Sequence, residues 1–239
     1  MTSHGYGFAG RIALVTGASR GIGRAAALAL AKVGAHVVAV ARTAGGLEEL
    51  DDDIGKAGGT ATLVPLDLKD FAGIDRMAAA LLERWGRLDA LFGNAGILGP
   101  LTPMTHLQPK AWDDIMAVNV TANWRLLRAL DGALRQSDSG RVLMASSGIV
   151  RHNRPYWGGY AISKAALETL TLTYAAECNG TNVKANVFNP GKTRTRMRAE
   201  AMPGEDPMTL PAPEELTPLI LELLSPGCMR NGELVNFRR

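Results

Sequence analysis

The chain has 239 residues, 46% of them hydrophobic, and 26 basic against 23 acidic residues give it a formal net charge of +3. This length and composition suffice for a sizeable core within one domain. The charges are dispersed, which argues against a nucleic-acid-binding stripe although the sequence pI is about 9.0. Cys178 and Cys228 stand alone, without the spacing of a metal site or of a disulfide framework.

No targeting or membrane segment is evident. Residues 1–7 lack the basic and apolar blocks of a signal peptide, and no apolar run approaches the roughly 18 residues of a membrane span. We therefore expect a cytoplasmic protein with a single domain over residues 1–239, no membrane or nucleic-acid partner and no bound metal.

Short apolar runs alternate with longer segments of helical periodicity along the chain. The runs cover 12–15, 36–41, 61–66, 90–92, 141–146 and 182–188. The helical segments cover 23–33, 47–56, 74–85, 112–134 and 160–177. This alternation predicts repeated βαβ units, and therefore a doubly wound parallel sheet of Rossmann type with helices on both faces, a three-layer α/β/α fold.

One segment interrupts the alternation. Arginines alternate with other residues from Arg194 to Arg198, and five prolines or glycines follow before residue 214. Long irregular excursions of compact domains often cover a ligand, so we expect residues 192–213 to form a substrate lid.

Three glycines follow the first predicted strand in the stretch TGASRGIGRA, which begins at Thr16. In a doubly wound sheet this turn faces the ligand crevice, and the next helix points its N-terminus into it. Gly17 permits the tight exit from the strand, Gly21 lets the backbone approach a pyrophosphate, and Gly23 allows close packing of helix on strand. The turn therefore predicts a dinucleotide site.

The spacing T-G-x-x-x-G-x-G resembles the short-chain dehydrogenase/reductase family, and further landmarks occur in that family's order. They are Asp67-Leu68, Asn94-Ala95-Gly96, Asn119, Ser147, YAISK at 160–164 and NPGKTRT at 189–195. The stretch from 189 onward also resembles a bacterial branch similar to the 3-oxoacyl-carrier-protein reductases. The resemblance implies a sheet of about seven strands and an oxidoreductase that interconverts a carbonyl and a secondary alcohol.

Tyr160 and Lys164 are four residues apart on a predicted helix, so they share a face and Lys164 leans back towards Tyr160. A phenol titrates near 10, and lowering that pKa by about three units takes roughly 4 kcal/mol. An ammonium ~4.5 Å away at an effective dielectric of ~20 supplies about that much. The resemblance implies that Tyr160 is the general acid and base and that Lys164 also holds the cofactor ribose.

Two further residues complete the catalytic set that the resemblance implies. Ser147 follows a predicted strand, where such folds place their chemistry, and its hydroxyl can steady the substrate oxygen. Ser146, whose side chain points to the opposite side of the strand, is expected to be structural. Asn119, within the segment 112–134, is implied to hold a water that links Lys164 to solvent.

The resemblance also implies a set of cofactor contacts. The Asn94-Ala95-Gly96 backbone should pass near the adenosine ribose, and Asp67 should accept a hydrogen bond from the adenine amine. Gly191 and Thr195 should lie at the nicotinamide amide. The full expected set is Gly17, Ser19, Arg20, Gly21, Ile22, Gly23, Arg42, Asp67, Leu68, Asn94, Ala95, Gly96, Tyr160, Lys164, Pro190, Gly191, Thr193 and Thr195.

Cofactor choice is indicated at the end of the second predicted strand. Enzymes that use NAD usually have an acid there, whereas this chain has Ala41 followed by Arg42. Arg20 in the glycine turn and Arg42 could flank a 2′-phosphate, which suits guanidinium geometry. We therefore expect NADP(H) to be preferred over NAD(H). The alternative is that both arginines are solvated surface charges.

The motifs leave the kind of function, the substrate and the assembly open. The domain could be a nucleotide-sensing module without turnover, although the intact set of Asn119, Ser147, Tyr160 and Lys164 favours an enzyme. The segment between Ser147 and Tyr160 should line the substrate pocket, and the substrate could be a 3-oxoacyl thioester, a ketone, an aldehyde, a sugar or a steroid. Members of the family pair through the helices at 112–134 and 160–177, which implies a homodimer or homotetramer. The ending at 231–239 lacks the glycine-rich close of many relatives, which speaks against the tetramer.

Overall fold

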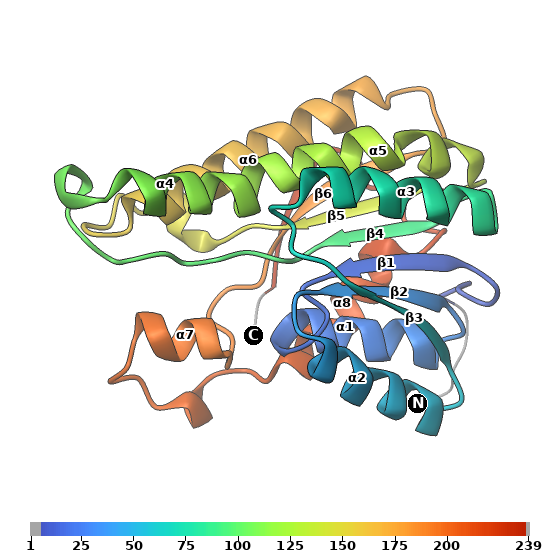
Figure 1. Ribbon diagram of the computed structural model, residues 1–239, viewed down its shortest axis with the longest axis horizontal. Coiled ribbons are helices and arrows are strands. Elements are labelled where there is room, and N and C mark those ends of the chain that lie inside the picture. The colour runs from blue at the N-terminus through green and yellow to red at the C-terminus, as the bar shows by residue number, and fades with distance from the viewer. Residues whose placement is uncertain (1–5, 238–239) are drawn as a thin grey trace.

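The computed structural model describes residues 6–237. Seven strands form one parallel sheet in the order β3-β2-β1-β4-β5-β6-β7, and helices lie against both of its faces (Figure 1). The strands are β1 (Ile12–Thr16), β2 (His36–Ala41), β3 (Thr60–Pro65), β4 (Ala90–Gly93), β5 (Arg141–Ala145), β6 (Lys184–Asn189) and β7 (Leu234–Asn236). The doubly wound α/β/α fold expected from the sequence is confirmed.

The helices divide into two layers. They are α1 (Gly21–Lys32), α2 (Ala44–Lys56), α3 (Phe71–Trp85), α4 (Pro109–Met116), α5 (Ala122–Gln136), α6 (Gly158–Glu177), α7 (Arg196–Ala201) and α8 (Thr217–Leu224). Helices α1, α2 and α8 pack on one face of the sheet, and α3, α5 and α6 pack on the other. Helix α7 lies apart from both layers, on the side to which the strands point (Figure 1).

The central strands are buried on both faces, which explains their continuous apolar sequences. In β1, Ala13 and Val15 pack with the α1, α2 and α8 layer, whereas Ile12 and Leu14 pack with the α3, α5 and α6 layer. Strand β3 lies at the edge of the sheet and ends at Pro65, a position where the missing backbone donor is tolerated.

Several predicted boundaries were wrong. The segment 112–134 is not one helix: α4 and α5 are separated by a π-helical turn, Ala117–Thr121. Strand β5 ends at Ala145 rather than at residue 146, and most helices begin two or three residues earlier than predicted. No apolar run predicted β7. Residues 1–5 and 238–239 lie outside the described part of the chain. The expectations about the signal peptide at residues 1–7 and about the ending at 231–239 therefore concern residues that are only partly described.

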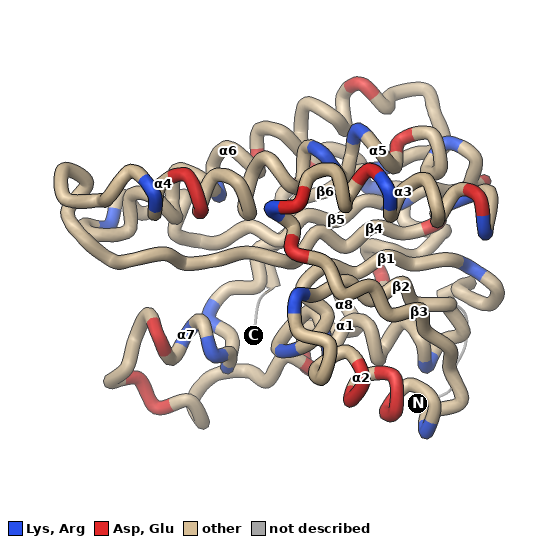
Figure 2. The backbone as a smooth tube through the Cα atoms, in the orientation of Figure 1, with Lys and Arg blue, Asp and Glu red and all other residues tan. Residues whose placement is uncertain are grey.

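Charged residues are spread over the elements. Basic and acidic positions are interleaved along most of the chain (Figure 2). Between residues 6 and 237, no helix combines the length and the apolar character that a membrane span requires. Within the same described range, His, Cys, Asp and Glu side chains form no group of three that could hold a metal ion.

The strand order reverses between β1 and β4, and the ends of these two strands are joined by hydrogen bonds. The hydroxyl oxygen of Thr16 accepts from the backbone N–H groups of Asn94 and Ala95, each at 3.0 Å. The side-chain amide of Asn94 donates to the Thr16 carbonyl at 3.1 Å. In open α/β sheets, ligands bind outside the carboxyl ends of the strands at such a reversal.

The first turn of α1 packs directly on this junction. A Cβ at Gly23 would overlap the carbonyl oxygen of Gly17 and would lie 2.5 Å from the amide nitrogen of Asn94. Gly17 itself has a φ of +67°, in the left-handed region that favours glycine. Both positions therefore require the absence of a side chain, which lets the glycine turn, α1 and the start of the loop after β4 pack closely at the strand reversal.

We expect Gly23→Ala to lower the free energy of unfolding by about 1–3 kcal/mol, because the added methyl overpacks the junction. Gly45→Ala is the matched control. Gly45 also lies in the first turn of a helix, but nothing lies within 4 Å of a Cβ there, so alanine should stabilise by up to about 1 kcal/mol. Urea denaturation of both variants measures the effects. A Gly23→Ala protein as stable as the wild type would contradict the close packing.

Candidate active site

Helix α6 brings Tyr160 and Lys164 together inside the protein. Both side chains are buried, and the Nζ atom of Lys164 lies 5.8 Å from the centre of the Tyr160 ring. Nζ donates a hydrogen bond of 2.7 Å to the carbonyl of Ala145, the last residue of β5. A Cβ on Gly96 would lie 3.3 Å from the same nitrogen. Three elements thus meet at this ammonium group: α6, β5 and the loop after β4.

Burial sets the pKa values of the pair. Burial raises the pKa of Tyr160 to about 12, and the hydroxyl of Ser147 opposes this shift by hydrogen bonding. Burial lowers the pKa of Lys164 to about 8. The expectation that Lys164 lowers the pKa of Tyr160 is therefore wrong for this arrangement. The ammonium is held at the Ala145 carbonyl, and desolvation of the phenol outweighs the remaining interactions.

The residues after β5 point alternately to two environments. Ser147 lies just before the 3₁₀ turn Gly148–Arg151, where its Oγ accepts a hydrogen bond from the backbone N–H of Ile149 at 3.4 Å. Its hydroxyl also hydrogen-bonds with the hydroxyl of Tyr160. Ser146 is buried and donates a 2.6 Å hydrogen bond to Glu168. Only Ser147 therefore faces Tyr160, because successive residues of an extended chain point in opposite directions.

Glu168 is a site residue that the sequence patterns did not indicate. Its carboxylate is buried on α6 and accepts from Ser146 with one oxygen, while the other oxygen lies 2.7 Å from the guanidinium of Arg151. It thereby connects α6 to both ends of the segment that carries Ser147. A signal was present: Glu168 is four residues after Lys164, on the helix face that Tyr160 and Lys164 share.

Asn119 lies in the π-helical turn, and its side chain is fully engaged. The side-chain amide donates to the carbonyl of Ile97 and to the hydroxyl of Ser163, each at 2.9 Å. Its oxygen accepts from the backbone N–H of Ile97 at 2.8 Å. Its own backbone carbonyl accepts from the side chain of Asn123, a second buried asparagine that was not predicted. Asn119 therefore fixes the loop after β4 against α6.

The glycine turn and the segment after β6 face each other. Gly21, at a φ of +56°, opens towards Thr195, whose Cγ2 would lie 3.5 Å from a Cβ there. Thr195 begins α7 by accepting from the backbone of Arg198 at 3.2 Å. Thr193 is buried and donates to the carbonyl of Pro190 at 3.1 Å. The residues expected at the pyrophosphate and at the nicotinamide amide thus lie next to each other.

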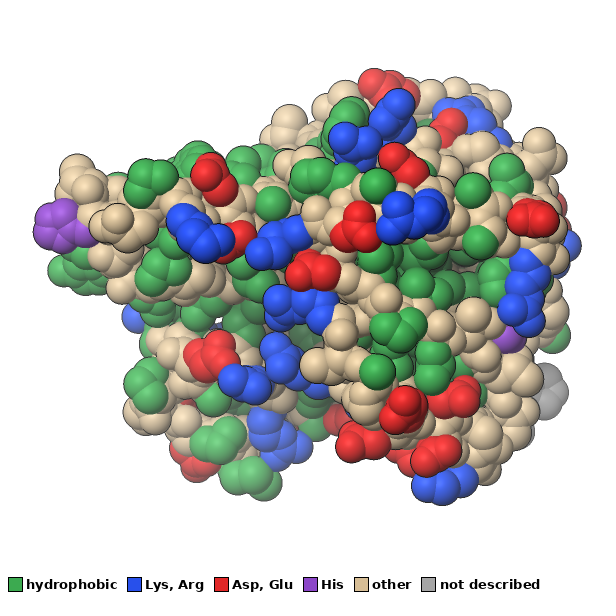
Figure 3. Space-filling view, in the orientation of Figure 1, with side chains coloured by type: hydrophobic (Ala, Val, Ile, Leu, Met, Phe, Trp, Pro, Cys, Tyr) green, Lys and Arg blue, Asp and Glu red, His purple; other side chains and the backbone are tan. Residues whose placement is uncertain are grey.

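The two arginines at the predicted adenosine end are accessible. Arg20 and Arg42 are exposed, and neither is within ion-pair distance of any carboxylate in the described residues. Ala41 is buried at the end of β2. Asp67 accepts from the backbone of Lys69 at 2.9 Å, and Leu68 is buried. Basic side chains gather along the middle of this face, next to the hollow between α4 and α7 (Figure 3).

Apolar side chains surround Tyr160 on the side of α7. Leu98, Trp157 and Tyr160 form a small buried cluster, and four partly buried side chains pack against it: Ile149, Met197, Ala201 and Met202. Trp157 meets the Tyr160 ring edge-on at a centroid distance of 6.2 Å. We call these seven residues the apolar cluster. The predicted lid, residues 192–213, thus supplies three of its members.

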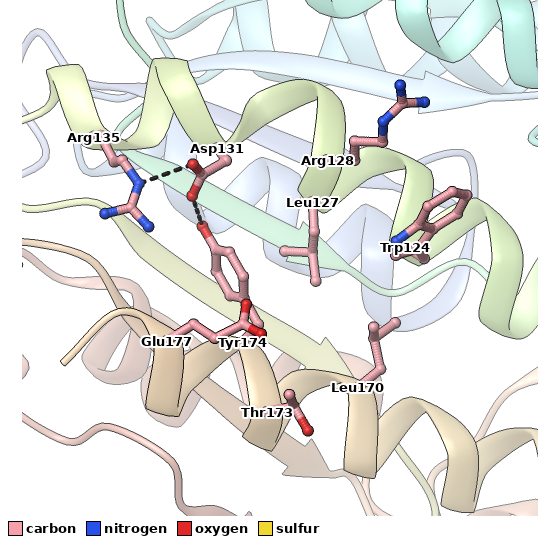
Figure 4. A pocket seen from close by; sticks show the side chains of 9 residues that line it. All are labelled: Trp124, Leu127, Arg128, Asp131, Arg135, Leu170, Thr173, Tyr174 and Glu177. Atoms are coloured by element: carbon pink, nitrogen blue, oxygen red, sulfur yellow. Dashed lines mark hydrogen bonds and ion pairs between the residues drawn. The ribbon is translucent and has the colours of Figure 1, made fainter.

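A separate pocket of about 370 Å³ lies on the outer surface between α5 and α6. Trp124, Asp131 and Arg135 line it from α5, and Leu170 and Tyr174 line it from α6 (Figure 4). The Tyr174 hydroxyl donates to Asp131 at 2.8 Å, and Arg135 contacts the other oxygen of that carboxylate at 2.8 Å. None of the residues expected at the catalytic or cofactor site lines this pocket.

A parallel sheet in this order, with a glycine turn at the strand reversal, defines a Rossmann-type nucleotide-binding fold. Residues 11–206 match the family model of the short chain dehydrogenases. The chain is 38% identical over 223 residues to the uncharacterized oxidoreductase YciK of Escherichia coli, which covers 92% of this chain and 88% of YciK. It is 34% identical over 190 residues to the E. coli 3-oxoacyl-[acyl-carrier-protein] reductase FabG, and this match covers 80% of this chain and 76% of FabG.

Solved structures agree with this assignment. A short chain dehydrogenase from Shigella flexneri complexed with NADP superposes with a TM-score of 0.92 at 37% identity, over 96% of this chain and 97% of that one. The structure of yciK from E. coli gives a TM-score of 0.92 at 36% identity, over 98% and 97%. The chain belongs to the short-chain dehydrogenase/reductase family and is an oxidoreductase.

The burial of Lys164 predicts a pH dependence of stability. Its pKa is about 8 in the folded chain and about 10.4 in an unfolded one, so between these values the unfolded state binds more protons and stability rises with pH. Relative to Lys164→Met, the wild type should gain on the order of 3 kcal/mol between pH 7.5 and pH 10.5, at about 1.36 kcal/mol per pKa unit. Urea denaturation of both proteins across this range measures the gain. A constant difference would show that the ammonium is not desolvated.

Proposed function

We propose that the protein is an NADP(H)-dependent oxidoreductase that interconverts a carbonyl and a secondary alcohol, with Tyr160 as the general acid and base. The observation that carries the proposal is the meeting of Tyr160, Ser147 and Lys164 at the carboxyl end of β5, next to the reversal of strand order. The relatives named above are oxidoreductases, which supports the reaction class.

The hydroxyls of Tyr160 and Ser147 lie side by side, so both can contact one substrate oxygen. A bound nicotinamide cofactor supplies or accepts the hydride. With a pKa of about 12, the phenol of Tyr160 is protonated at neutral pH, and it donates its proton to the substrate oxygen as charge develops there. This is the protonation state that a general acid needs for carbonyl reduction.

Lys164 and Asn119 lie close together near Tyr160, the proposed proton donor. They flank the same glycine, because a Cβ on Gly96 would lie 3.3 Å from Nζ of Lys164 and 3.2 Å from Oδ1 of Asn119. With its pKa lowered to about 8, Lys164 exchanges a proton near neutral pH. We propose that it returns a proton to Tyr160 after each turnover, and that Asn119, which donates to Ser163 of α6, holds the water that links Lys164 to solvent.

The residues at the strand reversal fit a dinucleotide. A Cβ at Gly21 would meet only the side chain of Thr195 within 4 Å, so the backbone of this turn is open to a pyrophosphate. We propose that the cofactor is held by Gly17, Ser19, Arg20, Gly21, Ile22, Gly23, Arg42, Asp67, Leu68, Asn94, Ala95, Gly96, Tyr160, Lys164, Pro190, Gly191, Thr193 and Thr195. The exposed guanidiniums of Arg20 and Arg42 supply the charge for a 2′-phosphate and favour NADPH.

The remaining parts follow the same proposal. The chain forms one domain with residues 192–213 as a lid, since α7 contributes Met197 and Ala201 to the apolar cluster. Two copies or more associate through the α5 and α6 surface, where Trp124 is 44% exposed beside the pocket of Figure 4. The protein acts in the cytoplasm on a small-molecule substrate.

Turnover of NADPH against a panel of 3-oxoacyl thioesters, diketones, quinones, aldehydes and ketosugars tests the reaction. We expect Tyr160→Phe to lower kcat/KM by roughly 10²–10⁴-fold, the usual contribution of a general acid, because phenylalanine keeps the packing and removes the proton. NADPH affinity should change little. Tight NADPH binding without turnover of any panel member by the wild type would instead favour a nucleotide sensor.

Cofactor choice has its own test. Arg42→Ala should weaken NADPH binding about 10- to 100-fold, because a charge-assisted hydrogen bond contributes about 1.5–3 kcal/mol, and it should leave NADH binding unchanged. Isothermal titration calorimetry with both cofactors measures this. Arg76→Ala is the control, since Arg76 on α3 is also exposed but pairs with Asp70. NADH binding as tightly as NADPH, with no effect of Arg42→Ala on either, would sink the proposal.

A further inference from the structure

A strained tight turn at residues 154–157 stands beside the proposed catalytic tyrosine. The backbone N–H of Trp157 donates to the carbonyl of Arg154 at 3.4 Å, which closes a four-residue turn with Pro155 second and Tyr156 third. Tyr156 has a φ of +73° and is the one non-glycine residue with a left-handed φ in the described part of the chain. A turn with proline second and a left-handed third residue usually has glycine there.

The turn is held from outside. The carbonyl of Tyr156 accepts a 3.0 Å hydrogen bond from the backbone of Thr102, in the loop that follows β4. Strained backbone of this kind persists where the surrounding structure fixes it, and such positions cluster at ligand sites. The strained turn, held by Thr102, therefore fixes the positions of the two side chains at its ends, Arg154 and Trp157.

Those side chains form a continuous row with Tyr160. The indole of Trp157 packs on the Tyr160 ring at 6.2 Å, and the guanidinium carbon of Arg154 lies over the indole, 5.5 Å from its ring centre. Nη2 of Arg154 also lies 3.9 Å from the sulfur of Met202 in the proposed lid. The guanidinium of Arg154 thus borders the apolar cluster at the end that lies away from the Tyr160 hydroxyl.

The charge of Arg154 is not neutralised within the described structure. Three arginines of the adjoining segments each pair with an acid: Arg151 with Glu168, Arg196 with Glu200, and Arg198 with Glu205. No carboxylate among residues 6–237 lies within ion-pair distance of Arg154. A guanidinium stacked on an aromatic ring keeps its edge nitrogens available for an oxyanion.

The side chains between Arg154 and Tyr160 can adapt to an apolar guest. Met197 and Met202 face the row from α7 and its C-terminal end, and both are only partly buried. Methionine is unbranched and flexible, so it refills a gap or gives way to a bound chain more easily than branched residues do.

We propose that Arg154 and the apolar cluster form a substrate site for carbonyl compounds with an apolar body and an anionic group, a carboxylate or a phosphate. The anion binds the edge of the Arg154 guanidinium, and the apolar body lies along Trp157, Met197 and Met202. The carbonyl then reaches the hydroxyls of Tyr160 and Ser147. This inference depends on the proposed reductase function and names the substrate class of the same site.

Matched substrate pairs test the proposal. Oxo-carboxylic acids of increasing chain length are compared with their methyl esters, and oxo-alkyl phosphates with the parent alcohols, with NADPH in saturation. We expect the wild type to prefer the anionic member of each pair. Arg154→Gln should raise the KM of the anionic members at least about tenfold, from loss of a charge-assisted hydrogen bond, with kcat and the neutral members little changed. Arg154→Lys should restore part of the preference.

Arg84→Gln is the control variant. Arg84 also stacks on a tryptophan, 4.8 Å from the ring centre of Trp85, but it lies at the end of α3 next to the amino end of the sheet. Equal use of acids and esters by the wild type would overturn the proposal, as would an Arg154→Gln effect of the same size on both. Comparing carboxylates with phosphates identifies the anion.

A binding arm separates this proposal from the reductase function. If no panel member turns over, binding of the same acids and esters to the complex with NADPH is measured by calorimetry. Acid binding that Arg154→Gln abolishes, without turnover, would support the anion site and contradict the proposed reaction. Acids that bind wild type and Arg154→Gln equally, or bind neither, would overturn the anion site.

Discussion

The enclosed ammonium of Lys164 is the constraint around which the site is arranged. A charged group inside a protein is costly unless it is hydrogen-bonded, and here the acceptor is one backbone carbonyl, that of Ala145. That carbonyl is available because β5 ends there. The loop after β4 also approaches this ammonium group closely, because a side chain at Gly96 would press on Nζ. The lysine thus fixes the relative positions of a helix, a strand end and a loop.

One face of α6 meets three successive residues at the end of β5. Lys164 contacts the carbonyl of Ala145, Glu168 accepts from Ser146, and Tyr160 meets Ser147. The helix positions are four residues apart, so they stack along one side, while the strand residues alternate in direction. This pairing orients Ser147, because Ser146, the residue before it, is anchored on α6 through Glu168. Arg151 extends the anchor to the turn that follows Ser147.

Sequence patterns predicted the layers of the fold, which the structure confirms, because apolar periodicity is a local signal. The four residues expected to be catalytic come from short motifs, and their roles stay a prediction. The π turn at Ala117–Thr121 could not be predicted in this way, since Asn119 gains its partners from Ile97 and Ser163, which are distant in sequence. The pKa of Tyr160 was misjudged for the same reason: how deeply the phenol is buried depends on side chains from several elements. Boundaries at Gly21 and Ala44 were missed because small residues at helix starts carry no periodic signal.

The π turn has a consequence for how this chain can change in length. It places one extra residue between α4 and α5, and the carbonyls it releases include that of Asn119, which Asn123 then occupies. Deleting a single residue here would convert the wide turn into a regular α-helical turn. The carbonyl of Asn119 would then pair with a backbone N–H group instead of with the side chain of Asn123. Surface loops generally tolerate insertions, whereas within this buried stretch the number of residues is itself part of the site.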